Sequence, residues 1–343
     1  MRSWLWLAAL TACGHDPAHP GDAVADGATT DAAPLEAIHY VGRFDAQHRA
    51  AWPGSAVHTR FTGTDLMVEL ADTGTNWFEI TVDGVALAPL VTHSGDRAYP
   101  IATGLAAGDH DLVLAKRTES FQGTVTFAGF PGATLVPTPR PTRLVEFIGD
   151  SITCGYGDLG VGPSCEFSPE TESEPAAWGA LAEQALGVPH VSIAYSGIGM
   201  VRDVAGTTMN VMPVKYLRTF ADDASSTWDF SYTPDVIVIA LGTNDFAGGD
   251  PGGAFVTAYV GFVQMLEAKF PAVKILVATS PMNGDPKLLG YLHDVAAQTD
   301  VTVVELAVQL AADGYGCDYH PSAVSHTRMA ATIVPAIRAV TGW

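Results

Sequence analysis

Hydrophobic and polar residues alternate along the chain between Ile38 and about Pro139. Segments with this alternation, or close to it, are 57–61, 66–70, 78–82, 111–116 and 124–127. A period of two is typical of strands that turn one face to a core and the other to solvent. The pair Asp83-Gly84, directly after the third segment, indicates a hairpin turn. Short strands at this spacing predict a β-sandwich, and we expect it to be a jelly roll.

The pattern changes after the proline-rich run at 137–141. Continuous apolar segments, as expected of strands buried on both faces, lie at 143–148, 191–194, 236–241, 274–278 and 301–306. Segments of helical character intervene at 175–186, 254–270, 286–298 and 322–339. Strands that alternate with helices predict a three-layer α/β fold around a parallel sheet. An active site in such a fold lies at the C-terminal edge of the strands.

Length and composition agree with two globular domains. The chain has 343 residues, more than one hydrophobic core usually serves, and 48% of them are hydrophobic. We expect a signal and linker segment at 1–34, a β-sandwich domain at 35–139 and an α/β domain at 140–343. The net charge of −20 would repel phosphate backbones, which argues against a nucleic-acid-binding protein.

The first residues predict export. Arg2 precedes the apolar run 4–10, which is too short to span a bilayer and is typical of a signal-peptide core. Leu10-Thr11-Ala12-Cys13 resembles the bacterial lipobox, in which the cysteine is lipidated and becomes the new N-terminus. We therefore expect an extracytoplasmic protein: either a lipoprotein attached to a membrane through Cys13, or a secreted protein in which Cys13 is incidental. The segment is short for a signal, which leaves the position of the start codon open.

Polar clusters follow the predicted strands of the α/β domain. They are Gly149-Asp150-Ser151, Ser196-Gly197, Gly242-Thr243-Asn244 and, just before the last helix, Asp318-Tyr319-His320. Taken singly, each is explained by a turn, a helix N-cap or a solvated loop. Together, in this order and at the edge of one sheet, they predict an active site with a serine nucleophile.

These blocks resemble those of the SGNH hydrolase superfamily. The longer stretches 149–157, 242–246 and 316–322 look like carbohydrate esterase family 2, as do Gly42-Arg43-Phe44-Asp45 and Trp52-Pro53-Gly54-Ser55 upstream. The resemblance covers about 38–343. It implies a jelly roll followed by an SGNH hydrolase domain that removes acetyl groups from plant polysaccharides of the xylan or mannan type. It implies no metal or other cofactor.

The resemblance also implies roles for single residues. Ser151 would be the nucleophile and His320 its general base. The oxyanion would be held by the backbone N–H groups of Ser151 and Gly197 and by the side-chain amide of Asn244. Asp318 would orient the imidazole of His320 and stabilise its protonated form.

The placement of Asp318 departs from the wider superfamily. There the acid usually lies three residues before the histidine, at the position that Cys317 occupies in this chain. Some members of carbohydrate esterase family 2 lack the acid and orient the histidine through a backbone carbonyl, so a Ser–His dyad is the alternative. A zinc site built from Asp318, His320 and His326 is disfavoured because His326 falls within the last predicted helix.

Three aromatic residues are candidates for contact with sugar rings. Tyr156 and Phe246 directly follow catalytic blocks. Trp228 is the third, with a place in the hydrophobic core as its alternative interpretation.

The cysteines leave several pairings open. If Cys13 is lipidated, Cys154, Cys165 and Cys317 remain in an oxidising compartment, and one of them stays unpaired. Cys154 could close a small loop with Cys165. It could also lie beside Cys317, because both are three residues from a predicted catalytic residue.

Two other functions fit the same pattern. One is an SGNH esterase, lipase or thioesterase acting on a different acyl ester, since a fold does not decide the substrate. The other is a non-catalytic carbohydrate-binding lipoprotein, which the intact set of catalytic residues disfavours. Because that set lies beyond 141, a chain beginning near Thr142 is expected to keep activity on a small ester. The shortened chain should lose more of its activity on polysaccharides, because the first domain would supply part of the surface that binds them.

Overall fold

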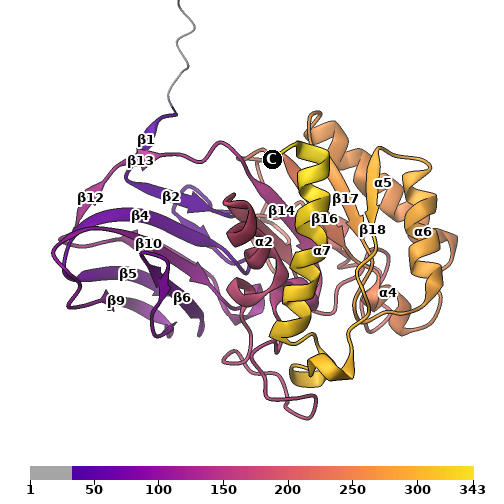
Figure 1. Cartoon of the computed structure of the whole chain (residues 1–343), viewed down its shortest axis with the longest axis horizontal. Helices are drawn as coiled ribbons and strands as arrows, with labels where there is room; N and C mark the ends of the chain where they lie inside the picture. Colours follow the sequence, from indigo (N-terminus) through magenta and orange to yellow (C-terminus); the bar gives the residue numbers. More distant parts are fainter. Residues whose placement is uncertain (1–32) are drawn as a thin grey trace, which may run out of the picture. The chain divides into compact units, whose positions relative to one another are not determined.

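The computed structural model of the chain describes residues 33–343 (Figure 1). Cys13 and nearly all of the predicted signal and linker segment lie outside the described residues. Within 33–343, no helix is both long and apolar enough to cross a membrane.

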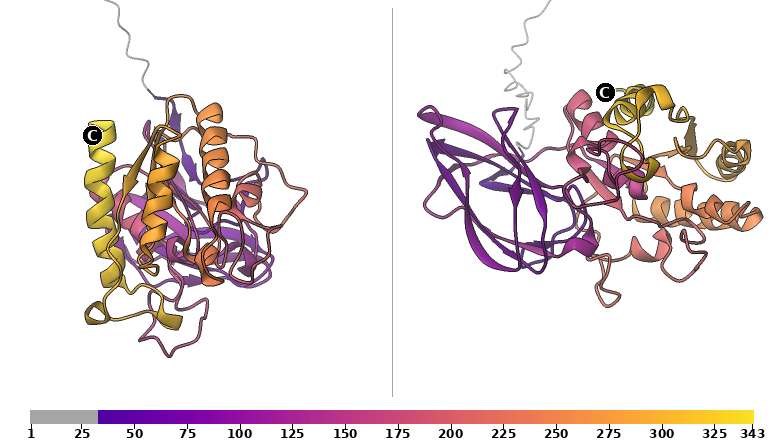
Figure 2. Two further views of the ribbon diagram at one scale, coloured as in Figure 1. Left: turned by 90° about the vertical axis from the view of Figure 1, so that its right-hand side faces the viewer. Right: turned by 90° about the horizontal axis from the view of Figure 1, so that it is seen from below.

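The first part of the described chain is a sandwich of two antiparallel sheets (Figure 2). The larger sheet contains β2 (Ile38–Val41), β4 (Ala56–Gly63), β6 (Trp77–Val82), β7 (Val85–Ala86), β8 (Leu90–Val91), β10 (Gly108–Lys116) and β12 (Thr134–Val136). Its strand order is β12-β4-β10-β6-β7, with β2 beside β4 and β8 beside β6. The smaller sheet contains β3 (Arg49–Ala50), β5 (Leu66–Asp72), β9 (Gly95–Ala102) and β11 (Val125–Gly129), in the order β3-β11-β5-β9. The sandwich predicted from the alternating pattern is confirmed.

The alternation places the apolar side chains between the two sheets. Leu112 and Leu114 of β10 and Val68 and Leu70 of β5 are almost completely buried in one shared core. The expected hairpin is also present, because Val82 pairs with Val85 across Asp83 and Gly84. Both turn residues have positive φ, 50° and 77°, as a type I′ turn requires. A short ladder between β1 (Leu35–Glu36) and β13 (Thr138–Pro139) joins the two ends of the sandwich.

The second part is a parallel sheet between two layers of helices (Figures 1 and 2). Its strands are β14 (Val145–Gly149), β15 (His190–Ala194), β16 (Val236–Ala240), β17 (Lys274–Ala278) and β18 (Val301–Val304), in the order β15-β14-β16-β17-β18. The main helices are α2 (Trp178–Leu186), α5 (Gly253–Lys269), α6 (Pro286–Ala296) and α7 (Ala323–Thr341). All five strands and four helices expected from the sequence are therefore present.

The inner strands of this sheet contribute side chains to two cores, which explains their continuous apolar sequence. In β16, Val236 and Val238 pack with α2 and α7, whereas Ile237 and Ile239 pack with α5 and α6. A strand covered on both faces has no position at which a polar residue meets solvent. The three-layer α/β arrangement is thus confirmed.

The sandwich and the α/β part share one core. Trp52, from the loop before β4, is fully buried among residues of the α5–α6 side of the parallel sheet. Its indole Nε1 donates to the carbonyl of Thr219, at 2.9 Å. The two predicted domains are therefore joined by a hydrophobic interface and not only by the connecting chain.

A buried charge reinforces this junction. Arg43 of the sandwich has no exposed surface, and its guanidinium lies 3.8 Å from the carboxylate of Glu146, the second residue of β14. The same guanidinium lies over the rings of Trp228 and Tyr216, at 3.7 and 4.3 Å from their centroids. The family-like segments around Arg43 and Trp52 thus serve the contact between the two parts.

We predict that Trp52→Ala destabilises both parts together. The cavity left by a buried tryptophan typically costs about 3–5 kcal/mol in the free energy of unfolding. Equilibrium denaturation followed by tryptophan fluorescence and by far-ultraviolet circular dichroism should show one transition, shifted to lower denaturant. Val85→Ala, at an exposed position of the same sandwich, is the control. Two separate transitions, with that of the α/β part unshifted, would contradict the shared core.

Candidate active site

Three strand ends bring the predicted catalytic blocks to one edge of the parallel sheet. β14 ends at Gly149, β15 at Ala194 and β16 at Ala240, and these three residues are in register across the sheet. Gly149 admits no side chain, because a Cβ there would lie 2.0 Å from Oγ1 of Thr153. The chain can therefore turn directly from β14 into the short helix α1 (Ser151–Cys154), which begins with Ser151.

Ser151 and His320 meet at this edge although 169 residues separate them. The Nε2 atom of His320 lies 2.9 Å from Oγ of Ser151. The side chain of Asp150 caps α1 by accepting from the backbone N–H of Ile152 at 3.0 Å, which holds the start of the helix. This is the geometry in which an imidazole can take the hydroxyl proton of a serine.

Burial keeps His320 in the state that a base requires. The pKa of His320 lies below its ordinary value, chiefly because burial disfavours the charged imidazolium. The backbone carbonyls of Cys317 and Asp318, and after them the negative charge of Asp318, offset part of this effect. His320 is therefore neutral at neutral pH and able to accept a proton.

Asp318 does not take the place expected of it. Its Oδ2 atom accepts from the hydroxyl of Tyr156 at 2.9 Å and from the backbone N–H of Phe167 at 3.2 Å. Within the described chain, Nδ1 of His320 is buried and has no hydrogen-bond partner. No hydrogen bond therefore joins the carboxylate of Asp318 to the imidazole, an arrangement that favours the Ser–His dyad over the full triad.

The geometry of its loop explains the aspartate at position 318. Asp318 and Tyr319 have φ of 51° and 61°, in the left-handed region that costs most residues free energy. Aspartate tolerates this region better than most residues, and its carboxylate holds two neighbouring groups. Asp318 therefore shapes the loop that presents His320.

A disulfide holds the same loop. Cys165 and Cys317 are bonded, and Cys154 is free and buried. Neither pairing considered from the sequence, Cys154 with Cys165 or Cys154 with Cys317, is formed. The pairing of Cys154 with Cys165 rested only on nearness in sequence. The pairing of Cys154 with Cys317 is not formed because Cys317 lies beside the segment after α1, where the backbone carbonyl of Cys165 also accepts from the N–H of Asp318 at 3.1 Å.

The predicted oxyanion-hole residues lie close to the start of α1. Gly197 follows the end of β15, in a turn with φ of 74°. Asn244, in α4 (Thr243–Ala247), is buried; its Nδ2 donates to the carbonyl of Ile198 at 2.7 Å and lies 3.4 Å from Oδ2 of Asp150. Asn244 thus links the turn that carries Gly197 to the residue before Ser151.

An aromatic row leads away from His320. The ring of Tyr156 lies 4.2 Å from that of His320 and stacks on Phe167 at 4.5 Å, between centroids. Phe167 is in turn 6.0 Å from Phe121 of the sandwich, whose side chain is about half exposed. Tyr156 is therefore beside the site, as expected. Sequence reasoning missed Phe121 and Phe167 because neither follows a catalytic block.

The other two aromatic candidates lie elsewhere. Trp228 is only 2% exposed and packs under the guanidinium of Arg43, so its expected contact with sugar is wrong and its place is in the core. Phe246 is half-buried and packs near Phe255 and Tyr291, with centroids 6.1 and 6.2 Å away. Its ring contacts belong to the packing of α5 and α6, not to the site at Ser151.

The residues considered for zinc do not converge. Nδ1 of the fully buried His326 accepts from the backbone N–H of Trp178, which joins α7 to α2. Within residues 33–343, no group of three histidine, cysteine or acidic side chains is placed to hold a metal ion.

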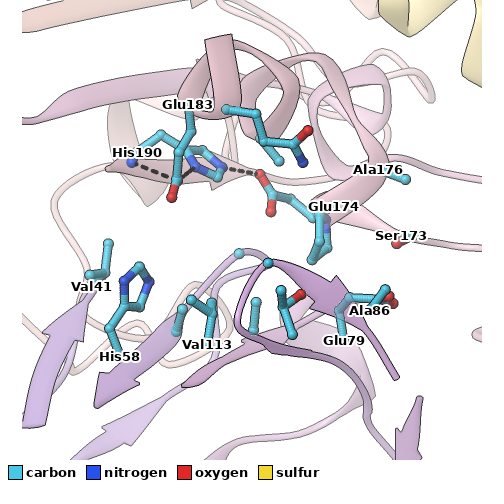
Figure 3. A pocket seen from close by; sticks show the side chains of 18 of the residues that line it. Val41, His58, Glu79, Ala86, Val113, Ser173, Glu174, Ala176, Glu183 and His190 are labelled. Carbon is cyan, nitrogen blue, oxygen red and sulfur yellow. Dashed lines mark hydrogen bonds and ion pairs between the residues drawn. The ribbon is translucent and has the colours of Figure 1, made fainter. Parts of the chain in front are cut away.

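A cavity of about 570 Å³ lies apart from Ser151 and His320, between the larger sheet of the sandwich and α2 (Figure 3). Its wall contains His190, with Nε2 2.7 Å from Glu174 and Nδ1 2.5 Å from Glu183. Burial lowers the pKa of His190, but the two carboxylates outweigh it and raise the pKa to about 10. His190 is thus a buried cation that ties β15 to its surroundings.

Known proteins resemble both parts of the chain. The family model "Carbohydrate esterase 2 N-terminal" matches residues 40–139, and "GDSL-like Lipase/Acylhydrolase family" matches 147–332. The chain is 36% identical to cellulase/esterase CelE of Acetivibrio thermocellus over 89% of its own length but only 40% of that protein's. It is 32% identical to an acetylxylan esterase / glucomannan deacetylase of Cellvibrio japonicus, over 80% of each chain.

A solved structure shows the same likeness in three dimensions. A family two carbohydrate esterase from Clostridium thermocellum, in complex with cellohexaose, superposes with a TM-score of 0.84 at 36% identity. The match covers 89% of this chain and 99% of that one. A family two carbohydrate esterase from Cellvibrio japonicus, at 24% identity and a TM-score of 0.79, shares the fold.

We predict a pH-dependent contribution of His190 to stability. Because its folded-state pKa is raised to about 10, the contribution is full below the ordinary value of 6.5 and is lost as pH rises through about 10. His190→Gln should therefore lower the melting temperature most near pH 6 and progressively less toward alkaline pH. Calorimetry at several pH values measures this, with exposed His93→Gln as control. A difference from the wild type that stays constant with pH would contradict the assignment.

Proposed function

Since the chain belongs to carbohydrate esterase family 2, we propose that it is a serine esterase that removes O-acetyl groups from polysaccharides of the xylan or mannan type. The observation that carries the proposal is the 2.9 Å contact between Oγ of Ser151 and Nε2 of His320 at the edge of the sheet. The relatives named as acetylxylan esterase / glucomannan deacetylase support the substrate class.

The proposed reaction proceeds in two acyl transfers. His320 takes the proton of Ser151 as Oγ attacks the acetyl carbonyl, and the resulting oxyanion accepts from the N–H groups of Ser151 and Gly197 and from Asn244. The bond from the acyl carbon to the sugar oxygen then breaks, and that oxygen takes the proton from His320. Water attacks the acetyl-enzyme, giving its proton to His320, and acetate leaves as the proton returns to Oγ.

We propose that the row formed by Tyr156, Phe167 and Phe121 supports the sugar chain. Aromatic rings pack well against the apolar faces of pyranose rings, and this row begins at the imidazole of His320. Phe121 comes from the sandwich, so both parts of the chain would contact a polymer. The related esterase solved with cellohexaose supports a glucan-like chain as a ligand.

We propose an extracytoplasmic location. Polysaccharides do not cross membranes, and the bond between Cys165 and Cys317 agrees with an oxidising compartment. It stays a prediction whether a lipidated Cys13 attaches the protein to a membrane of the cell envelope or the protein is secreted.

Replacing Ser151 with alanine tests the proposal. Release of acetate from acetylated xylan and glucomannan should fall by about 10³-fold or more, because no other group supplies the nucleophile. Circular dichroism and the melting temperature should stay those of the wild type. Thr257→Ala, at an exposed position of α5, is the control for a lost hydroxyl. Near-native turnover by a folded Ser151→Ala variant would refute the mechanism, whereas turnover by the wild type on lipid or thioesters alone would refute the substrate class.

Asp318→Asn should cost far less activity than His320→Ala. An asparagine side chain still accepts from Tyr156 or Phe167, and no hydrogen bond joins the carboxylate of Asp318 to His320. The acid limb of kcat/KM on p-nitrophenyl acetate, set by a His320 pKa that lies below its ordinary value, should move to slightly lower pH in Asp318→Asn, because the charge of Asp318 raises that pKa. An equal loss of activity in the two variants would show instead that Asp318 completes a catalytic triad.

A further inference from the structure

A glutamate of the sandwich reaches the turn that carries Gly197. Glu119 follows β10 and is completely buried. Its Oε2 accepts from the backbone N–H of Ser196 at 2.6 Å, and its Oε1 accepts from the hydroxyl of the same serine. Glu119 and Ser196 are 77 residues apart, on different parts of the chain. One side chain of the sandwich thus holds two groups of the residue before Gly197.

Ser196 and Gly197 are the central residues of a tight turn. The N–H of Ile198 donates to the carbonyl of Tyr195 at 3.4 Å, and φ is positive at Gly197 but not at Ser196. These features define a type II turn. The peptide between the central residues of a type II turn faces the opposite way from that of a type I turn, and this peptide carries the N–H of Gly197. A flip between the two types would turn that N–H away from the oxyanion.

Glu119 is itself held rigidly. Its backbone N–H donates to Oε2 of Glu172 at 3.1 Å, and its carbonyl accepts from Nζ of Lys116 at 3.0 Å. Burial raises the pKa of both glutamates and lowers that of Lys116 to about 8. Burial of such groups costs free energy that an apolar interface would not. Their presence beneath the catalytic edge therefore indicates a use other than stability.

We infer that Glu119 is a positioning residue, which holds the Ser196–Gly197 peptide in the orientation that an oxyanion hole requires. The inference rests on the proposed esterase function. The sandwich thus completes the active site of the α/β part instead of only offering a surface to polymers. A chain beginning near Thr142 would keep Ser151 and His320 but lose Glu119, so its expected activity on small esters is revised to a strong loss.

The test compares Glu119→Gln in the full chain with the wild type on p-nitrophenyl acetate. The glutamine oxygen can still accept from the backbone N–H of Ser196, but its NH₂ group can only donate to the serine hydroxyl, so the bond to the hydroxyl is reversed and both bonds lose the negative charge that strengthens them. Because oxyanion contacts act in the transition state, we expect kcat to fall by about 10- to 100-fold with KM nearly unchanged. The dissociation constant of phenylboronic acid, which forms a tetrahedral adduct on Ser151, should rise by a similar factor.

Glu174→Gln is the matched control. Glu174 is an equally buried acid near the junction, but it bonds to His190 and Ser192 and not to Ser196. This variant should lose stability and keep kcat. Should Glu119→Gln fail to fold, Ser196→Ala removes the hydroxyl bond alone, and it should lower kcat by a smaller factor at constant KM.

Native kcat and boronic-acid affinity in folded Glu119→Gln, or in Ser196→Ala where the first variant does not fold, would overturn the inference. So would equal losses of kcat in Glu119→Gln and Glu174→Gln. If these results were obtained while Ser151→Ala was inactive, the inference about Glu119 would be wrong but the proposed esterase function would still hold. Activity of Ser151→Ala would refute the proposed function instead.

Discussion

A guanidinium group buried away from water needs both a counter-charge and hydrogen-bond acceptors. Arg43 finds them in the carboxylate of Glu146 and the carbonyl of Arg218, between the faces of Trp228 and Tyr216. The constraint acts in both directions, since a glutamate inside a buried strand would be equally costly without the arginine. The sandwich and the parallel sheet must therefore come together for either charge to be tolerated. Ser151 stands two residues after the end of that same strand.

The junction matters for chemistry because it continues to the catalytic edge. From Arg43 and Trp52 in the core, contacts between the two parts extend to Glu119 at the turn that carries Gly197 and to Phe121 beside Phe167. Domain interfaces within a chain are often small and polar, which permits relative motion. Here the interface is apolar and contains paired charges, so a fixed geometry is expected at the residues that hold the oxyanion.

Three histidines show how the surroundings decide the state of one side chain. His320 is half-buried and His326 is buried, neither has a carboxylate bonded to the ring, and burial lowers the pKa of both. His190 is also buried, but Glu174 and Glu183 bond to its two ring nitrogens and raise its pKa instead. A neutral imidazole suits a base that must accept a proton from Ser151, and a charged one suits a structural link. The absence of a carboxylate on His320 is thus consistent with its proposed role.

The sequence by itself determined what depends on local pattern. The period of two gave the sandwich strands, the apolar runs gave the parallel strands, and Asp83-Gly84 gave the hairpin, because these features follow from which faces a segment must bury. The strand-end motifs also placed Ser151, Gly197 and Asn244 at one edge, since parallel strands all end on the same side of a sheet, and the order of the motifs assigned His320, in the loop before the last helix, to the same site. Only the tertiary structure decided the partners of Asp318, the pairing of Cys165 with Cys317, the burial of Trp228 and the contact of Glu119 with Ser196. Each of these is a distance between segments far apart in the chain, and a single sequence carries no record of such distances.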